Sequence, residues 1–174
     1  MKAISLWQPW GSAIPLGLKR IETRGWTTKV RGRIAVHASK RWTGEEKLFT
    51  AARRRAGDLL PDPMPLGAIV ATAVIWDVLP SEMLMARGIS DLELMYGNYS
   101  DGRFGWLLED VFALAEPIPF KGAQGFFNVP DELLPIEART PAKLRREIAP
   151  QMAWPFPVSA HHETTTPTQG ASHG

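Results

Sequence analysis

The 174-residue chain contains no cysteine. Disulfide bonds, cysteine-ligated metal sites and cysteine nucleophiles are therefore excluded. No apolar run approaches the ~20 residues of a membrane span, and the apolar stretch at the N-terminus is far too short for a secretory signal. These absences predict a soluble, cytoplasmic protein without a membrane partner.

Histidine and cofactor motifs are also scarce. Of the four histidines, His37 alone precedes the C-terminal tail, and it has no second histidine or nearby acid in the sequence with which to hold a metal ion. Residues 121–125 place glycines beside a lysine but lack the Gly-Lys-Ser/Thr order of a Walker motif. The sequence therefore implies no metal and no cofactor.

The composition fits one folded domain followed by a polar tail. A chain of this length, 44% hydrophobic, is large enough for a single domain with its own core. From residue 155 onward the chain consists largely of Pro, Thr, Ser, Gly and His, which predicts disorder. We therefore expect a domain over residues 1–135, a helical extension over 136–154 with an amphipathic helix starting at Thr140, and a disordered tail over 155–174.

The net charge of +2 hides a strong asymmetry. Residues 1–41 carry nine basic residues and one acid, a net charge of +8, whereas residues 42–174 carry eleven basic residues and seventeen acids, a net charge of −6. A basic segment of this size predicts a face for an anion, and polyphosphate is the commonest extended anion. The alternative is that these bases pair with acids of the later segment across the fold.

The densest charge cluster lies where a short helix is expected to give way to a strand. Residues 9–16 are predicted to be helical, and Gly17 can adopt the left-handed conformation that ends a helix. The chain then turns at Lys19 into a strand, in which alternate residues share a face.

That alternation places Arg20, Glu22 and Arg24 on one face, and the turn lets Lys19 join them at a cavity mouth. We take Lys19 and Glu22 as candidate catalytic residues, with Arg20 and Arg24 as candidate ligand-binding residues. The alternative is a surface strand in which Glu22 merely neutralises its arginine neighbours, an arrangement of little energetic effect.

Two further groups of residues are candidates for ligand binding. Gln8 and Trp10 lie at the helix start, where free backbone N–H groups can receive a phosphate or a base edge, whereas Trp7 is interpreted as a core residue. Strand alternation places His37 on the charged face of its strand. The remaining candidates, from the glycine-flanked loop, are Lys121 and Gln124.

The rest of the pattern predicts a mostly β fold with short helices. Residues 67–78 are apolar on both faces and predict a central strand, with Asp77 near its end as a carboxylate for the cavity mouth. Pro117 and Pro119 indicate an edge strand. The other predicted elements are a first strand at 3–7, a hairpin over 26–39 with a basic turn, a capped helix after Thr43, one or two helices over 81–96, a strand over 103–114 and a helical turn over 130–134.

The order of these motifs resembles the ASCH domain, a branch of the PUA-like superfamily. The resemblance covers roughly residues 1–135 and begins with Gly-x-Lys-x-x-Glu-x-Arg at residues 17–24, after a strand and the helix start at Gln8-Pro9-Trp10. It continues through residues 32–39, 67–73, 104–106 and 119–127. The resemblance implies an α+β fold, a PUA-like β-barrel with short helices packed around it.

The resemblance also implies RNA, because ASCH domains generally bind or act on RNA. The first hypothesis is a domain that binds RNA, a nucleoside or a nucleotide. The second is a small hydrolase, since one ASCH branch removes acyl groups from the amine of cytidine with a Lys-x-x-Thr pair and an acid from a later strand, and some relatives are described as ribonucleases. Here Lys19 matches that lysine, but Glu22 stands at the position of the threonine and Thr23 follows it.

A third hypothesis is a barrel whose partner is not a nucleic acid. The sequence leaves all three hypotheses open, and it specifies neither the ligand nor the oligomeric state.

Overall fold

The computed structural model describes residues 1–143 of the chain. Six strands form one sheet in the order β2-β5-β4-β3-β1-β6. The pair β1–β3 is parallel, and every other neighbouring pair in this order is antiparallel. The strands are β1 (Lys2–Leu6), β2 (Ile21–Arg24), β3 (Gly32–Ala38), β4 (Ala68–Pro80), β5 (Phe104–Pro119) and β6 (Phe126–Asn128).

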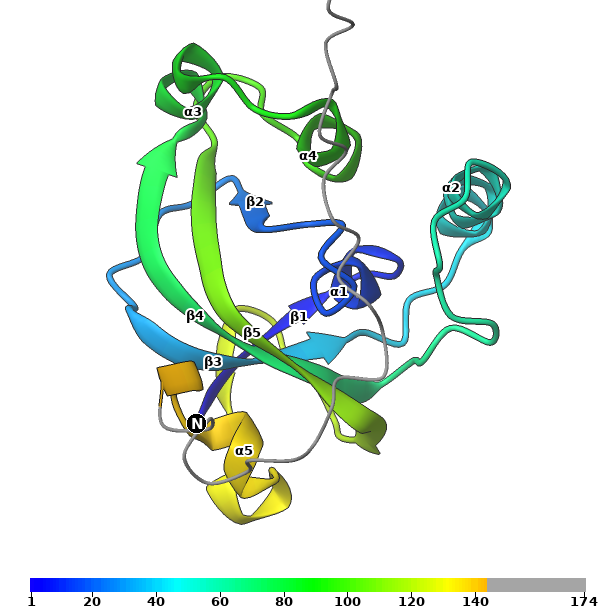
Figure 1. The fold of residues 1–174 in the computed structure, drawn as a ribbon, viewed down its shortest axis with the longest axis vertical. Coiled ribbons are helices and arrows are strands. Elements are labelled where there is room, and N and C mark those ends of the chain that lie inside the picture. Colours follow the sequence, from blue (N-terminus) through cyan, green and yellow to red (C-terminus); the bar gives the residue numbers. More distant parts are fainter. Residues whose placement is uncertain (144–174) are drawn as a thin grey trace, which may run out of the picture.

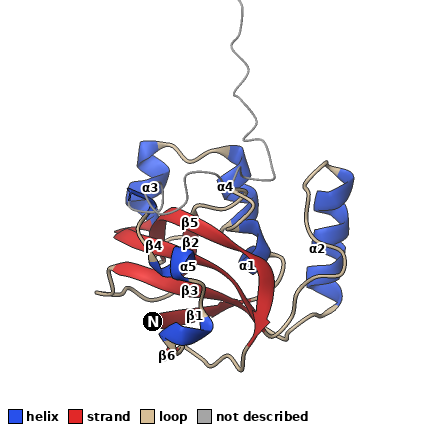
Figure 2. Cartoon of the chain, turned by 60° about the horizontal axis from the view of Figure 1, so that its bottom comes forward, coloured by secondary structure: helices blue, strands red, loops and turns tan. Residues whose placement is uncertain are grey.

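Short helices lie around this sheet (Figure 1). They are α1 (Trp10–Ala13), α2 (Gly44–Arg55), α3 (Ser81–Arg87), α4 (Asp91–Tyr96), the 3-10 helix η1 (Asp131–Leu133) and α5 (Ile136–Arg139). Figure 2 shows α1 and α4 beside one end of the curved strands, with α2 farther out. The predicted helix from Thr140 and the predicted tail from residue 155 lie almost wholly outside the described residues.

The sheet curls so that its two ends approach each other. Phe126 of β6 stacks on Trp106 of β5 with ring centroids 5.3 Å apart, and it meets Trp26, just beyond β2, edge-on at 5.8 Å. Trp106 is fully buried inside the curl. These aromatic contacts join the two sides of the curl, so that the α+β fold has the shape of a half-barrel.

Residues 67–78, the apolar segment predicted as a central strand, form most of β4, which lies inside the sheet. β4 lies between β3 and β5, and its first six residues are all buried. Apolar residues on both faces are needed there because one face packs inside the curl and the other packs beneath residues such as Leu134 and Ala138. The main core thus sits inside the curl, with a smaller core outside it.

The predicted hairpin over residues 26–39 is wrong. Only its second half is a strand, and that strand, β3, pairs with β1 and β4, whereas β2 pairs with β5. Residues 25–31 form no strand that could pair with β3, and β2, the strand before them, takes its partner from β5, where Trp106 lies directly opposite Glu22. The basic turn therefore connects two strands that are not neighbours.

The remaining predicted elements are found in the structure. Thr43 and Glu46 form a capping box at the start of α2, as expected, and residues 81–96 form two helices. Pro117 and Pro119 lie within the long strand β5, and β2 pairs only with its first four residues. Along its second half β5 has β4 as its one neighbour, so the two prolines occupy an edge position.

Candidate ligand-binding cleft

The junction between α1 and β2 has the predicted geometry. Gly17 has a φ of 73°, and the backbone N–H groups of Leu18 and Lys19 both donate to the carbonyl of Ala13, which closes the helix. The next strand begins at Ile21. Lys19 therefore lies on the turn, and its side chain enters the protein with 1% exposure.

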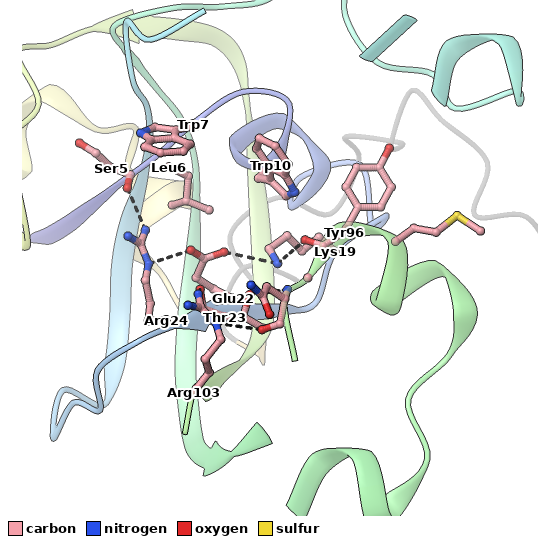
Figure 3. A pocket seen from close by; sticks show the side chains of 13 residues that line it. Ser5, Leu6, Trp7, Trp10, Lys19, Glu22, Thr23, Arg24, Tyr96 and Arg103 are labelled. Carbon is pink, nitrogen blue, oxygen red and sulfur yellow. Dashed lines mark hydrogen bonds and ion pairs between the residues drawn. The ribbon is translucent and has the colours of Figure 1, made fainter. Parts of the chain in front are cut away.

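Three charged side chains of the motif form a row in which Lys19 and Glu22 are buried and Arg24 is partly exposed (Figure 3). The Lys19 ammonium lies 3.4 Å from one carboxylate oxygen of Glu22, and Arg24 Nε lies 2.8 Å from the other. Lys19 also donates to the carbonyl of Tyr96 at 2.8 Å, and Arg24 donates to the carbonyl of Ser5 at 2.9 Å. Glu22 is only 8% exposed, so the interpretation as a surface strand with a weak exposed ion pair is wrong.

This row lines a cavity of about 410 Å³, here called the Glu22 cavity. Its volume is typical of a small-molecule site, for which roughly 300–1,000 Å³ is usual. In the view of Figure 3 the charged row runs below the rings of Trp7 and Trp10. The other lining residues come from β1, β2, the end of α4 and the α4–β5 connection, and include Leu6, Thr23, Tyr96, Asn98 and Arg103.

A second and larger cavity, here called the Lys121 cavity, has a volume of about 1070 Å³. It shares Ser5, Trp7 and Arg24 with the Glu22 cavity, so the two cavities are adjacent, and together they are called the cleft here. No Asp or Glu occurs among its lining residues. Its polar and charged lining consists of Ser5, Arg24, His37, Ser39, Lys40, Lys121 and Gln124.

Trp7 forms the wall between the two cavities. It is 49% exposed, so its interpretation as a core residue is wrong. The guanidinium of Arg41 lies 3.6 Å from the centre of the Trp7 ring, and Arg41 Nε donates to Glu46 at 2.7 Å. The position of Trp7, immediately after β1, puts a large aromatic face at the cleft instead of inside the curl.

His37 lies at the base of the Lys121 cavity and is 2% exposed. Its Nε2 is 3.0 Å from the carbonyl of Phe120, and its Nδ1 is 3.0 Å from the hydroxyl of Ser5. Since a carbonyl only accepts, Nε2 carries the proton in the neutral ring and Nδ1 accepts from Ser5. Burial lowers the pKa of His37, against the opposing effect of the Phe120 hydrogen bond.

Two predicted site residues lie outside the cleft. The side chain of Gln8 is fully buried and donates to Ser12 Oγ at 2.7 Å and to the carbonyl of Pro65 at 2.8 Å, which fixes α1 to the segment before β4. Arg20 is exposed and lines neither cavity. Its place before the first residue of β2 removes it from the alternation that directs Glu22 and Arg24 inward.

The other predicted residues divide between the two cavities. Lys19, Glu22, Arg24 and Trp10 line the Glu22 cavity, and Trp10 also stacks on Phe49 with ring centroids 5.4 Å apart. The residues that line the Lys121 cavity are Arg24, His37, Lys121 and Gln124.

Several lining residues were not predicted from the sequence. Asn98 and Arg103 belong to a segment interpreted only as a turn and a strand start, yet Arg103 donates to the backbone carbonyls of Thr23 and Asn98 and lines the Glu22 cavity. The carboxylate expected from Asp77 is absent from both linings, because Asp77 pairs with Arg31 at 3.3 Å. No local signal identifies such a pairing partner.

The basic N-terminal segment is partly neutralised across the fold. Arg31, Arg33 and Arg41 pair with Asp77, Asp110 and Glu46 of the later segment. By contrast, within residues 1–143 neither Lys40 nor Lys121 makes an ion pair, and both are exposed. Lys40 and Lys121 thus leave two unpaired positive charges in the Lys121 cavity. Lys2, Arg20 and Lys29, which also make no ion pair within residues 1–143, line neither cavity.

Together, these features define the class of protein: an α+β half-barrel with a cationic, aromatic-walled cleft. The ASCH domain family model matches residues 4–118, more than half of the chain, and the chain therefore belongs to the ASCH domain family. In the described part of the chain, no helix is both apolar and long enough to cross a membrane, and no group of three or more His, Asp or Glu side chains is placed to hold a metal ion.

The comparison with solved structures finds ASCH proteins from Zymomonas mobilis. The crystal structure of ASCH from Zymomonas mobilis is 18% identical, with a TM-score of 0.48, and the match covers 76% of this chain and 89% of that chain. Two single-residue mutants of the Zymomonas mobilis protein are 17% and 19% identical, both with a TM-score of 0.48 and 76% coverage of this chain, and with 91% and 89% coverage of their own. A search of the curated proteins finds no match.

Proposed function

We propose that the cleft binds RNA or a nucleotide, with a base in the Glu22 cavity. The observation that carries this proposal is the charge of the cleft: the side chains that line it include five Lys or Arg residues and one acid, Glu22. A cationic groove with aromatic walls is the usual arrangement for single-stranded nucleic acid, because it combines phosphate attraction with base stacking. Membership of the ASCH family supports the same ligand class.

Glu22 is the residue that would select the base. Its carboxylate accepts about four hydrogen bonds, and the contacts with Lys19 and Arg24 leave acceptor capacity on both oxygens. A carboxylate that lines a pocket favours a base with an amino group, such as the exocyclic amine of cytosine. The ring of Trp7, exposed on the cleft, provides a stacking surface.

The proposal is tested by titrating short single-stranded RNAs and cytidine into the protein and measuring heat or fluorescence. Glu22→Gln keeps the shape of the side chain but loses the carboxylate, and it should weaken cytidine binding by roughly tenfold or more. Lys29→Gln is the matched control, because Lys29 is exposed and lines neither cavity. Equal binding by wild type and Glu22→Gln would exclude the Glu22 cavity as the base site.

A second candidate function is hydrolysis at the same cavity, using Lys19 and Glu22. The observation in its favour is that Thr23 lines the Glu22 cavity beside these two residues, so a lysine, a carboxylate and a hydroxyl all border one space. The hydroxyl of Thr23 accepts a hydrogen bond from the Asn98 N–H at 3.0 Å. In this reaction Glu22 would take a proton from a water that attacks the acyl carbonyl, and would pass that proton to the cytidine amine as the C–N bond breaks, so that cytidine and the free acid are released.

Incubation with N4-acetylcytidine and with short RNAs, followed by chromatography, distinguishes the functions. Release of acetate or of RNA fragments that disappears in Glu22→Gln identifies an amidohydrolase or a ribonuclease. Binding of these ligands without formation of any product would support the first hypothesis, a domain that binds RNA or a nucleotide without hydrolysing it. Binding of a ligand that is neither nucleic acid nor nucleotide, with no dependence on salt, would support the third hypothesis.

A further inference from the structure

We propose that the Lys121 cavity is a phosphate subsite, so that the ligand of the cleft is a phosphorylated nucleotide unit. The inference rests on the proposed function for the base, but the phosphate half stands on its own observations. The Lys121 cavity combines three cations, Arg24, Lys40 and Lys121, with no carboxylate among its lining residues.

The three cations come from separate parts of the sheet and meet at one cavity. Arg24 ends β2, Lys40 follows β3 and Lys121 follows β5. Hydroxyl and amide groups of Ser39 and Gln124 complete the lining with neutral donors. Groups that can donate or that carry positive charge, with no carboxylate beside them, suit an anion with several acceptor oxygens, which is the chemistry of a phosphate.

Lys40 is held in place by a glycine. A Cβ on Gly67 would lie 2.7 Å from Lys40 Cε and 2.8 Å from Lys40 Cγ, so the stem of Lys40 lies directly on the Gly67 backbone. Gly67 also has a φ of 63°, a conformation that favours glycine. The stem of a lysine packed in this way loses little further freedom when the ammonium binds an anion.

Lys121 is anchored by the residue before it. The backbone N–H of Phe120 donates to the Gly67 carbonyl at 3.0 Å, and the Phe120 carbonyl accepts from His37 at 3.0 Å. Gly122 follows immediately and lies against the ring of His37, since a Cβ there would come within 2.3 Å of His37 Cε1. Gly67 thus contacts both lysine-bearing segments, and the cations are brought together by rigid elements of the fold.

The shared wall links this subsite to the base site. Arg24 borders both cavities and has five N–H donors, of which the contacts with Glu22 and with Ser5 occupy only part. A ligand whose base lies beside Glu22 would therefore place its phosphate next to Arg24, within the Lys121 cavity. The phosphate comes either from the terminal monoester of a nucleotide or from the backbone diester of RNA, and the cavity chemistry suits both.

The test compares three ligands by calorimetry: cytidine, cytidine 5′-monophosphate, and cytidylyl-cytidine without a terminal phosphate. We expect the monophosphate to bind wild type roughly tenfold or more tightly than cytidine, because charge-assisted hydrogen bonds contribute on that order. In Lys40→Gln/Lys121→Gln the advantage should shrink to within about twofold. A dinucleotide as tight as the monophosphate identifies the diester as a source, and a dinucleotide as weak as cytidine identifies the terminal monoester.

The proposal is overturned if the monophosphate binds no more tightly than cytidine, or if its advantage persists in the double variant. Lys29→Gln serves as the control for removal of an exposed charge and should retain the full advantage. Inorganic pyrophosphate separates the two proposals, since it needs no base site. If wild type binds pyrophosphate, the double variant does not, and neither binds cytidine, the phosphate subsite is supported and the base site is rejected. If wild type does not bind pyrophosphate, the phosphate subsite is rejected.

Discussion

The two cavities of the cleft differ in whether their charged side chains form ion pairs and in how exposed those side chains are. In the Glu22 cavity three of the four charged side chains pair with one another, in the row from Lys19 through Glu22 to Arg24, and Lys19 and Glu22 are buried. In the Lys121 cavity the lysines are exposed and make no ion pair within residues 1–143. Substitutions in the first cavity should therefore affect both stability and binding, whereas lysine substitutions in the second should affect binding alone.

The largest stability effect is expected for Glu22→Ala. Removal of the carboxylate leaves the ammonium of Lys19, which is 1% exposed, without its counter-charge. Breaking a buried pair in this way typically costs about 3–5 kcal/mol. Urea unfolding followed by tryptophan fluorescence measures the change in free energy of unfolding.

The control for Glu22→Ala is the double variant Lys19→Met/Glu22→Gln, which removes both charges and should recover much of the stability. A destabilisation below about 1 kcal/mol in Glu22→Ala would show that the row behaves as an exposed pair, contrary to the difference between the cavities.

A smaller effect is expected for Gly122→Ala, which tests the support of the Lys121 cavity. The added Cβ would come within 2.3 Å of His37 Cε1 and 2.6 Å of Ser5 Oγ, so the loop has to move. Overpacking of this kind costs about 1–3 kcal/mol. The shift should also weaken binding of cytidine 5′-monophosphate, which calorimetry measures.

Gly44→Ala is the matched control for Gly122→Ala. A Cβ at Gly44 meets nothing within 4 Å, and alanine suits a helix better than glycine, so this variant should be neutral or slightly stabilising. If Gly122→Ala were equally harmless, the loop would not be fixed by His37.

The pH dependence of stability should be modest and should depend on His37. Its folded-state pKa is lowered from 6.5, so the unfolded state takes up a proton first as the pH falls. The contribution of His37 is complete above pH 6.5 and is lost as the pH falls from there through the lowered pKa. Urea midpoints between pH 7.5 and pH 5 should fall more steeply for wild type than for His37→Gln, and parallel lines would contradict the assigned burial.

The smallest stability effect is expected for Lys40→Gln/Lys121→Gln. Both side chains are exposed, and exposed substitutions usually change stability by about 0.5 kcal/mol or less. The melting temperature of the double variant should therefore match that of wild type. A clear decrease in stability would mean that these lysines support the fold, and the comparison between the two cavities would fail.

The sequence predicted correctly those elements whose formation depends on residues close together in the chain. The helix stop at Gly17, the capping box between Thr43 and Glu46 and the apolar strand β4 each depend on residues close in sequence. The convergence of Lys19 and Glu22 followed from the same junction, since a turn and a strand place both on one side.

Features that depend on distant partners were not predictable. The strand β2 pairs with β5, about eighty residues later, so the sequence-adjacent hairpin was a reasonable but wrong interpretation. For the same reason the sequence did not predict that Asp77 pairs with Arg31 across the fold. It also did not predict that Trp7 is exposed, because that exposure depends on the curl of the sheet. The amide of Gln8 has the donor and acceptor groups that suit a ligand, yet its donor is occupied by hydrogen bonds to Ser12 and Pro65.

The most direct test of the whole account is the salt dependence of binding of a short single-stranded RNA to wild type and to Lys40→Gln/Lys121→Gln. Neutralising phosphates releases counterions, so the logarithm of the wild-type affinity should fall linearly with the logarithm of salt concentration. Each phosphate that is no longer neutralised reduces the magnitude of this logarithmic slope by about 0.7. The slope should therefore become shallower by roughly one in the double variant. An unchanged slope, or RNA binding indifferent to salt in wild type, would contradict a cleft built to receive phosphate.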